Sequence, residues 1–352
     1  MSSALPMRDS QVNYLVNSNF NVIQYGGGPF TSATTPANSD DTYLLDQWVL
    51  LSDGNDIVDV SHQTAVIPTI GSRCALKLEV ETANKKFGMI QFLEHKDAQN
   101  LTNRPVSVSF QARNAAADDL TDVLKCAVLA WDSTQDVITS DVVSAWNADL
   151  TSPTLVANWT YENTPTNLTL TQTFQTFRIE NISLDTASTA NLAVFIWCDN
   201  ADGAVDDAVY ITDVKLEVGA QATQYYPPLF SADLAACQRY LWKTFPYETV
   251  PAQNVGTIIG TISYNVWVGS NITAGATGVD FPVVMRVTPT MTYYNPAGAN
   301  TNWHNADRGA DSGASTGGGT TSWRCLNVQN AQDVADLATQ TCVIHAKAVA
   351  QL

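Results

Sequence analysis

Short stretches of alternating apolar and polar residues constrain the fold of this chain more than any other feature. The clearest alternating stretches are Arg73–Val80, Val106–Phe110, Phe174–Ile179 and Val209–Val218. A period of two places successive side chains on opposite faces of a β-strand. Turn-forming Asn, Asp, Gly and Pro residues separate the stretches. The pattern predicts a mainly β fold, an antiparallel β-sandwich that buries one face of each sheet.

The alternation also sorts individual side chains. Within Phe174–Ile179, it places Thr176 and Arg178 on the face opposite to Phe177 and Ile179. Leu192–Cys198 is almost continuously apolar, which is typical of a strand that is buried on both faces.

The chain carries few charges, and most of them are acidic. Only 14% of the residues are charged, compared with roughly 25% in an average soluble domain. The 34 acidic and 17 basic residues give a net charge of −17. Such a surface repels a phosphate backbone, so we do not expect nucleic acid as a partner. The same charge permits binding of a hard cation.

The six cysteines are scattered along the chain, at Cys74, Cys126, Cys198, Cys237, Cys325 and Cys342. They form no CxxC pair, which argues against a zinc site. Cys74, Cys126, Cys198 and Cys342 lie in apolar, strand-like runs, where a thiol packs as a small hydrophobic group. We therefore predict buried reduced thiols in preference to disulfides.

One segment departs from the strand pattern. In Ser231–Phe245, Leu234, Cys237 and Leu241 recur at helical spacing behind a serine that can cap a helix. We interpret it as a link between two domains. The predicted organisation is an N-terminal arm at 1–12, a sandwich domain at 13–228, a linking helix at 229–246 and a smaller C-terminal β domain at 247–352 with a long irregular loop at 297–322.

No segment has the features of a membrane anchor or a signal peptide. Met1–Ser10 lacks an apolar run, and no stretch of about 18 apolar residues occurs. We therefore expect no membrane partner.

Four motifs resemble those of phage tail-fibre and virion surface proteins, and they occur in that family's order. They are the opening NYLVNSNFNVIQ (Asn13–Gln24) followed by LDQW (Leu45–Trp48), the closing strand ITDVKLEVGAQAT (Ile211–Thr223), the CQRYY-type segment DLAACQRY (Asp233–Tyr240) and FPVVMRVTPT (Phe281–Thr290).

The resemblance implies a jelly-roll domain similar to carbohydrate-binding modules, then a short helix and a C-terminal β domain. Such proteins are found in tail fibres, tail tips and head decorations, often as homotrimers. Because the family opening begins by about residue 13, we expect a compact tip or decoration protein. The resemblance also marks Cys237, Gln238, Arg239 and Tyr240 as a structural joint.

A calcium ion is the one cofactor that the resemblance allows. In calcium-binding carbohydrate modules, the ion links the opening strand to the closing strand, and the matching positions here are Asn21 and Asp213. Two predicted turns are also rich in acidic residues, one with Asp199, Asp202, Asp206 and Asp207 and one with Asp53 and Asp56. Neither has the DxDxDG spacing of a calcium loop. Solvated turns are the alternative interpretation of these acidic residues.

Aromatic residues are the candidates for contact with sugars, because pyranose rings stack their C–H faces on Trp and Tyr. The candidates in the first domain are Trp131, Trp146, Trp159 and Tyr161. Those in the second are Trp303, His304 and Trp323, which border or lie in the long loop. The alternative for each aromatic side chain is a place in the core or in a subunit interface.

The sequence offers no convincing catalytic constellation. Gly313–Gly317 matches GxSxG, but it lies in a run of Gly, Ser and Thr and not between a strand and a helix. The histidines His62, His95, His304 and His345 lack the spacing of a metal or triad site. We therefore expect a protein that is not an enzyme.

These observations predict a bacteriophage virion structural protein, assembled in the host cytoplasm. The leading hypothesis is a tail fibre, tail tip or receptor-binding subunit that contacts host surface glycans without catalysis. The alternative is a capsid decoration or head-fibre protein that acts through protein–protein contacts. The expected partners are other virion proteins, further copies of the chain and host surface polysaccharide.

Overall fold

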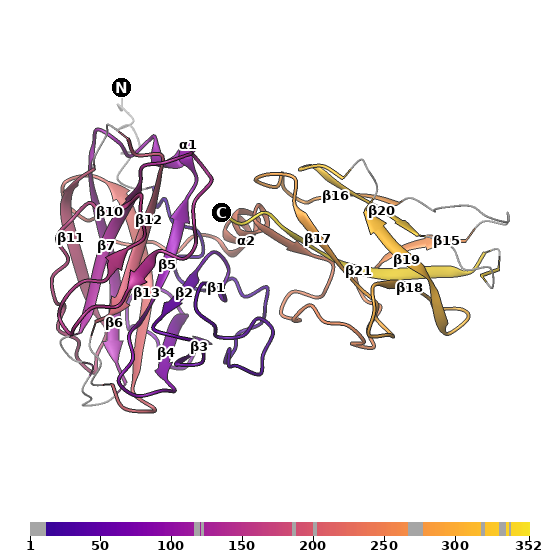
Figure 1. The fold of residues 1–352 in the computed structure, drawn as a ribbon, viewed down its shortest axis with the longest axis horizontal. Coiled ribbons are helices and arrows are strands. Elements are labelled where there is room, and N and C mark those ends of the chain that lie inside the picture. Colours follow the sequence, from indigo (N-terminus) through magenta and orange to yellow (C-terminus); the bar gives the residue numbers. More distant parts are fainter. Residues whose placement is uncertain are drawn as a thin grey trace, which may run out of the picture. The chain divides into compact units, whose positions relative to one another are not determined.

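The computed structural model describes residues 12–115, 120, 123–184, 188–199, 203–266, 277–317, 321–330, 336–337 and 339–352. The chain divides into two compact units. The first consists of Met1–Ile23, Gly27–Phe230 and Leu352, and the second of Gln24–Gly26 and Ser231–Gln351. Figure 1 shows the strands of both units.

The first unit contains two antiparallel sheets. The six-stranded sheet has the order β1 (Thr42–Tyr43), β2 (Val49–Ser52), β5 (Phe87–Leu93), β12 (Asn191–Cys198), β7 (Leu124–Trp131) and β10 (Trp159–Tyr161). The five-stranded sheet has the order β11 (Gln175–Ser183), β6 (Pro105–Asn114), β13 (Ala208–Val218), β4 (Ala75–Val80) and β3 (Val58–Gln63). The helix α1 (His95–Ala98) and the hairpin of β8 (Val143–Ala145) and β9 (Thr154–Leu155) complete the unit. The predicted antiparallel β-sandwich is confirmed.

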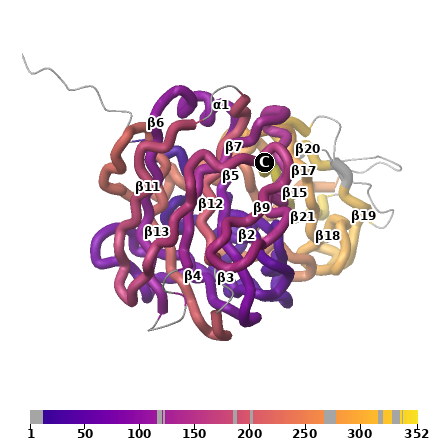
Figure 2. Tube along the Cα trace, turned by 60° about the vertical axis from the view of Figure 1, so that its left-hand side comes forward, coloured from indigo at the N-terminus to yellow at the C-terminus, as the bar shows by residue number. Residues whose placement is uncertain are grey.

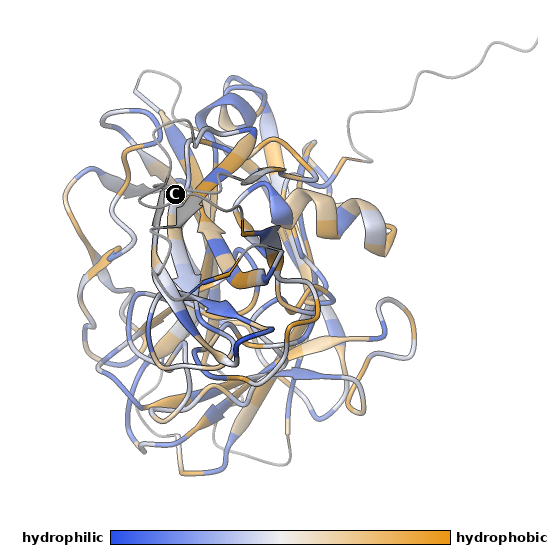
Figure 3. Cartoon of the chain, turned by 90° about the vertical axis from the view of Figure 1, so that its right-hand side faces the viewer, coloured by the Kyte–Doolittle hydropathy of each residue, from blue (hydrophilic) through white to orange (hydrophobic). Residues whose placement is uncertain are grey.

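Segments far apart in the sequence lie side by side in these sheets, as β4 and β13 do (Figure 2). All residues of β12 are buried, as its continuous apolar sequence predicts. Elsewhere polar and apolar residues intermix along the strands (Figure 3). In β6, the even-numbered residues Val108, Phe110 and Ala112 are buried, whereas Gln111 and Arg113 are half-buried. One face of β6 therefore packs in the core, and the other carries polar side chains that are partly open to solvent.

The opening motif is attached to the closing strand by asparagine side chains. Asn13 Nδ2 donates to the Val214 carbonyl at 2.9 Å, and Asn13 Oδ1 accepts from the Leu216 amide at 3.0 Å. Asn17 has a positive φ of 48° and closes a turn through two hydrogen bonds with the Val22 backbone. Asn tolerates this conformation better than most residues. In the opening motif, the asparagines that resemble those of phage proteins therefore fix the backbone conformation through hydrogen bonds.

The second unit is built around one long strand, β21 (Thr341–Val349). The order of its sheet is β14 (Leu241–Lys243), β21, β18 (Asn302–Asn305), β19 (Ala310–Gly317), β20 (Cys325–Asn330) and β16 (Thr277–Asp280), and β15 (Ile262–Asn265) and β17 (Thr290–Tyr294) also pair with β21. Its core contains Trp303, Met285, Leu326, Cys342 and Ile344.

Two predictions about this unit are wrong. The helix α2 (Phe230–Gln238) ends seven residues before Phe245, because Leu241–Lys243 pairs with β21 and buries all three of its side chains. The segment 297–322 is not an irregular loop, because it contains the paired strands β18 and β19. Sheet pairing overrides the loop-like composition there, because backbone hydrogen bonds do not depend on side-chain size.

All six cysteines are free, and Cys325 alone is partly exposed. Burial raises the pKa of Cys126 and Cys198, the latter to about 12. These thiols pack as small hydrophobic groups, as the sequence predicts. Neither helix of the described residues is long and apolar enough to cross a membrane.

The second unit is expected to lose stability as the pH falls, through His345. This side chain is fully buried, stacks on Phe245 at 3.9 Å, and its Nδ1 and Nε2 contact Thr244 Oγ1 and the Thr257 carbonyl oxygen. Burial lowers the pKa of His345, although the Thr257 carbonyl opposes the shift. The folded state therefore favours neutral imidazole, and its stability declines as pH falls through the unfolded pKa of about 6.5.

Denaturant unfolding between about pH 7 and about pH 5 checks this expectation. The wild-type protein should lose more stability over this range than the His345→Gln variant, which does not titrate there. Parallel pH profiles for the two proteins would contradict it.

Candidate functional site

The four aromatic candidates of the first unit lie together, but in a packed cluster. Trp131 and Trp159 are 6% and 4% exposed, with ring centroids 5.3 Å apart. Trp146 packs on Phe195 and Tyr161 packs on the same cluster, where the Tyr161 hydroxyl donates to the Pro153 carbonyl. The buried rings of Trp131 and Trp159 have no free face for a sugar, so the prediction for these two residues is wrong.

The cluster covers one face of the six-stranded sheet. Phe195 and Trp197 of β12 contribute the face of that strand opposite to Leu192, Val194 and Ile196. Side chains of β2, β5 and β7 extend the same face. The segment 138–161, which includes β8 and β9, packs against it through Ile138, Val142 and Trp146. This segment therefore removes the outer face of the six-stranded sheet from solvent.

The three candidates of the second unit differ in burial and in the groups that they contact. Trp303 is fully buried and meets Tyr264 edge to face at 4.9 Å, so it cannot stack on a sugar. His304 Nδ1 lies 3.9 Å from Asp311 Oδ1. Trp323 is 46% exposed, and the Arg324 guanidinium lies 5.9 Å from the centre of its ring. Trp323 alone among these three presents an open aromatic surface.

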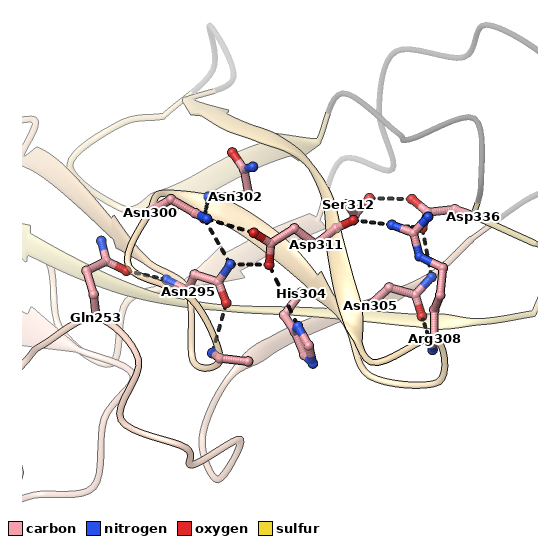
Figure 4. Close-up of polar contacts among 11 residues, drawn as sticks. Gln253, Asn295, Asn300, Asn302, His304, Asn305, Arg308, Asp311, Ser312 and Asp336 are labelled. Carbon is pink, nitrogen blue, oxygen red and sulfur yellow. Dashed lines mark hydrogen bonds and ion pairs between the residues drawn. The ribbon is translucent and has the colours of Figure 1, made fainter.

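Polar side chains of the second unit form a network around two carboxylates (Figure 4). Asn295 and Asn300 both donate to Asp311 at 2.7 Å. Asn305 and Ser312 donate to the buried Asp336, which also lies 3.4 Å from Arg308. The amide donors satisfy the carboxylates and join β18 and β19 to their neighbours, so this network stabilises the fold.

The GxSxG match has no catalytic geometry. Ser315 lies within β19, and its hydroxyl donates to the Thr301 carbonyl. A nucleophile elbow requires a sharp turn between a strand and a helix. The serine is therefore a strand residue.

The positions suggested for calcium are engaged by protein groups. Asn21 Oδ1 accepts from the Cys74 thiol at 3.3 Å. Asp213 accepts from the Ser72 amide at 3.2 Å and from Gln111 Nε2 at 2.7 Å. Among the residues that the structure describes, no group of three or more His, Cys, Asp or Glu could hold a metal ion.

The joint residues lie at the beginning of the second unit. Cys237 and Tyr240 are buried, and the Ala350 amide donates to the Tyr240 carbonyl at 2.7 Å. Gln238 is the last residue of α2, and Arg239 Nη1 reaches the Val284 carbonyl at 3.4 Å. Arg286 makes two shorter hydrogen bonds than the one from Arg239. Its Nε and Nη2 donate to the carbonyls of residues 350 and 351 at 2.8 and 2.7 Å. The motif thus ties α2 to the end of the chain.

An open cleft of about 600 Å³ lies on the outer face of the five-stranded sheet. We call it the β6–β11 cleft. Its lining comprises Ile67, Thr69, Ile70, Gly71, Ser109, Phe110, Gln111, Arg113, Gln172, Thr173, Phe174, Thr176, Arg178, Asp213, Thr223, Gln224 and Tyr225.

The floor of the cleft follows from strand alternation. Ser109, Gln111 and Arg113 are alternate residues of β6, on the face opposite to its buried apolar residues. Thr176 and Arg178 of β11 pair with Gln111 and Ser109. These five side chains therefore share one face of the sheet, as the pattern of Phe174–Ile179 predicts for the β11 pair.

Asp213 lies at the bottom of the cleft in an irregular part of β13. The register with β6 shifts between Thr212 and Lys215, and Asp213 has a positive φ of 55°. Burial raises the pKa of Asp213, and hydrogen bonds from Ser72 and Gln111 oppose this shift. The register shift is a β-bulge, which turns the Asp213 side chain toward the cleft.

Gly71 allows the loop beside Asp213 to approach closely. Its φ is +125°, and a Cβ at this position would lie 2.0 Å from Asp213 Oδ2 and 2.6 Å from Gln111 Nε2. Only glycine fits both the conformation and the space.

One wall of the cleft is fixed by a buried ion pair. Lys215 Nζ lies 3.0 Å from Glu217 Oε2, and both side chains are nearly or fully buried. Thr223 donates its amide and its hydroxyl to Glu217, each at 2.6 Å. The Tyr225 hydroxyl lies 2.9 Å from Ser18 Oγ of the opening motif. The closing-strand motif therefore positions residues 223–225.

Comparisons with known proteins assign no family. No protein-family model matches the chain, and no curated protein matches it. The enzymatically active domain of tailspike protein 4 of Bacteriophage CBA120 is 13% identical with a TM-score of 0.34, over 60% of this chain and 22% of that one. The match thus covers less than a quarter of that tailspike domain.

Two further solved structures overlap the chain to a similar extent. The carbohydrate-binding module TmCBM61, in complex with β-1,4-galactotriose, is 15% identical with a TM-score of 0.31, over 59% of this chain and 99% of that one. A cyclase from Fischerella sp. TAU is 11% identical with a TM-score of 0.35, over 60% of this chain and 99% of that one. Similarities at these identities and TM-scores assign neither a family nor an activity to the chain.

Sequence reasoning missed most of the cleft. The alternation places Thr176 and Arg178 on one face, but it does not identify their neighbours on β6 and β13. The positive φ values of Gly71 and Asp213 leave no recognisable pattern in the sequence.

Proposed function

We propose that this chain is a phage virion protein that binds host surface glycans through the β6–β11 cleft and does not cleave them. The observation that carries the proposal is the cleft itself, a polar hollow on a sheet face that the sandwich core does not use. The four phage-like motifs, in family order, support the virion role.

The chemistry of the cleft suits sugars. Hydroxyl, amide and guanidinium groups from Ser109, Gln111 and Arg178 offer donors and acceptors on a rigid sheet. Phe174 and Tyr225 are half-buried in its lining and add aromatic surface. Sites for small polar ligands combine apolar surface with a few placed polar groups in this manner.

The acidic groups of the cleft do not support hydrolysis. Glycosidases use two carboxyl groups on either side of the scissile bond. Asp213 is the only acidic residue among the described residues of the lining, and it is held by Ser72 and Gln111. We therefore expect binding without release of shortened sugars.

A bulky side chain at position 176 is expected to abolish glycan binding. Thr176→Trp places an indole in the cleft from an exposed position on β11. Binding of purified protein to a glycan array and to host envelope fractions measures the effect. Thr160→Trp, at an exposed position on β10 outside the cleft lining, is the matched control.

Wild type and the Thr160→Trp variant should bind the same glycans, and Thr176→Trp should bind none. Equal binding by all three proteins would exclude the cleft as the site. Release of reducing ends from a bound polymer would show that the protein is an enzyme.

The alternative, a capsid decoration or head-fibre protein, is supported by exposed apolar side chains on the second unit. Apolar surface of this kind favours protein–protein contact. The exposed residues are Ile258, Ile259, Val284, Val287 and Trp323. Immunogold labelling of particles decides between tail and head. We also propose a homotrimer, as the resemblance implies, and the mass of the purified protein in solution tests it.

A further inference from the structure

The β6–β11 cleft concentrates positive charge in a chain that is acidic overall. The net charge of the chain is −17, yet the cleft contains Arg113 and Arg178 and one acidic residue, Asp213. The Asp213 carboxylate accepts hydrogen bonds from Ser72 and Gln111. Both of its oxygens therefore accept from neutral donors, and neither arginine is paired with it.

Arg178 is available to a ligand. It is exposed on β11, which is the edge strand of its sheet, and it lies opposite Ser109. Within the described ranges of the chain, no group accepts a hydrogen bond from its guanidinium and no carboxylate pairs with it. A guanidinium on a rigid strand is a suitable partner for a carboxylate, which it can bind through two parallel hydrogen bonds.

Arg113 is fixed in position by the protein. Its Nε and Nη2 donate to the carbonyls of Asn114 and Ala115 at 2.8 and 2.9 Å, and its guanidinium lies 5.6 Å from the centre of the Tyr210 ring. Its charge is therefore held at the cleft, although two of its three nitrogens are engaged. It adds positive potential without needing to reorganise.

We propose that the β6–β11 cleft selects acidic polysaccharides, with Arg178 binding the carboxylate of a uronic-acid-type sugar and Arg113 adding a second, fixed positive charge. This inference rests on the proposed function of the cleft as the glycan site. Half-buried Phe174 and Tyr225 provide the apolar surface on which the sugar ring packs.

Carboxyl reduction of the ligand tests the inference directly. Polygalacturonate, alginate and hyaluronan are compared with their carboxyl-reduced forms, which keep the sugar backbone and lose the charge. Titration calorimetry of wild type, Arg178→Gln and Arg104→Gln measures the affinities. Arg104 lies in the first unit outside the cleft lining and serves as the matched control.

Wild type and Arg104→Gln should bind at least one acidic polymer about tenfold more tightly than its reduced form, as expected for a charge-assisted contact. Arg178→Gln should lose that preference and leave the affinity for the reduced form unchanged. Because Arg178 is exposed, its variant should unfold like the wild type.

The outcomes separate this inference from the proposed function. Equal binding of acidic and reduced polymers, or binding of neutral polysaccharides alone, would overturn acid selection and leave glycan binding intact. An unchanged preference in Arg178→Gln would overturn the role of that residue. Failure to bind any polysaccharide would overturn both proposals.

Discussion

Replacing Asp199 with asparagine is expected to lower the free energy of unfolding of the first unit by about 3–5 kcal/mol, the usual cost of removing one partner from a buried ion pair. Asp199 is fully buried between two lysines that are themselves 3–4% exposed. Lys86 Nζ lies 3.3 Å from Asp199 Oδ1, and Lys125 Nζ pairs with its other oxygen. Without the carboxylate, Lys86 keeps only the partly exposed Asp149, at 3.3 Å, and the Lys125 ammonium remains in a site with little water.

The same cluster holds the segment that covers the six-stranded sheet. Lys86 donates to the Asn147 carbonyl at 2.6 Å, and Lys125 donates to the Leu150 carbonyl at 2.7 Å. Loss of Asp199 should therefore loosen residues 147–150 first.

Denaturant unfolding followed by tryptophan fluorescence measures the change. Asp206→Asn is the matched control, because Asp206 is an exposed acid in the neighbouring turn. The control should stay within about 0.5 kcal/mol of wild type, as is usual for surface substitutions. Equal stability of the two variants would show that the buried cluster is not structurally important.

Replacing Gly71 with alanine is expected to destabilise the first unit by about 2–3 kcal/mol and to abolish glycan binding. The new methyl group would meet Asp213 Oδ2 at 2.0 Å and Gln111 Nε2 at 2.6 Å, so either the loop or these two side chains of the cleft floor must shift. Strain from the φ of +125° adds to this effect.

Gly54→Ala separates steric overlap from backbone strain. Gly54 has a similar φ of +121°, but the nearest atom to an added Cβ lies 4.0 Å away. This control should lose about 1–2 kcal/mol from strain and should retain wild-type binding. Retained binding in Gly71→Ala would contradict the account of the cleft floor.

The sequence predicts the sandwich because strand alternation is a local property. The segments at 106–110 and 209–218 fall within β6 and β13, and most of the segment at 73–80 falls within β4 of the same sheet. The alternation at 174–179 also places Arg178 on the face where the structure has the cleft. Local patterns thus specify which side of a strand a residue occupies.

The sequence does not reveal which sheet faces stay accessible to solvent and which are covered by other segments. Trp131 and Trp159 are buried because residues 138–161 fold over the six-stranded sheet, a contact that no local pattern predicts. Asp199 resembles a residue of a solvated turn, yet it is the centre of a buried ion cluster, because its lysine partners lie 74 and 113 positions away in the chain. Long-range pairing decides these cases.

The ends of elements are also set by pairing. Ser231–Phe245 has helical spacing, but β21 captures Leu241–Lys243 as a strand. The Gly- and Ser-rich segment at 310–317 pairs with β18 and β20 although its composition favours a loop. Propensity gives way to tertiary context in both segments.

Hydrogen–deuterium exchange with a bound oligosaccharide tests the central claim most directly. The account predicts slower exchange at residues 109–113, 172–178 and 223–225, with the oligosaccharide recovered at its full length. Protection confined to residues 138–161 or to the surroundings of Trp323, or recovery of shortened sugars, would contradict it.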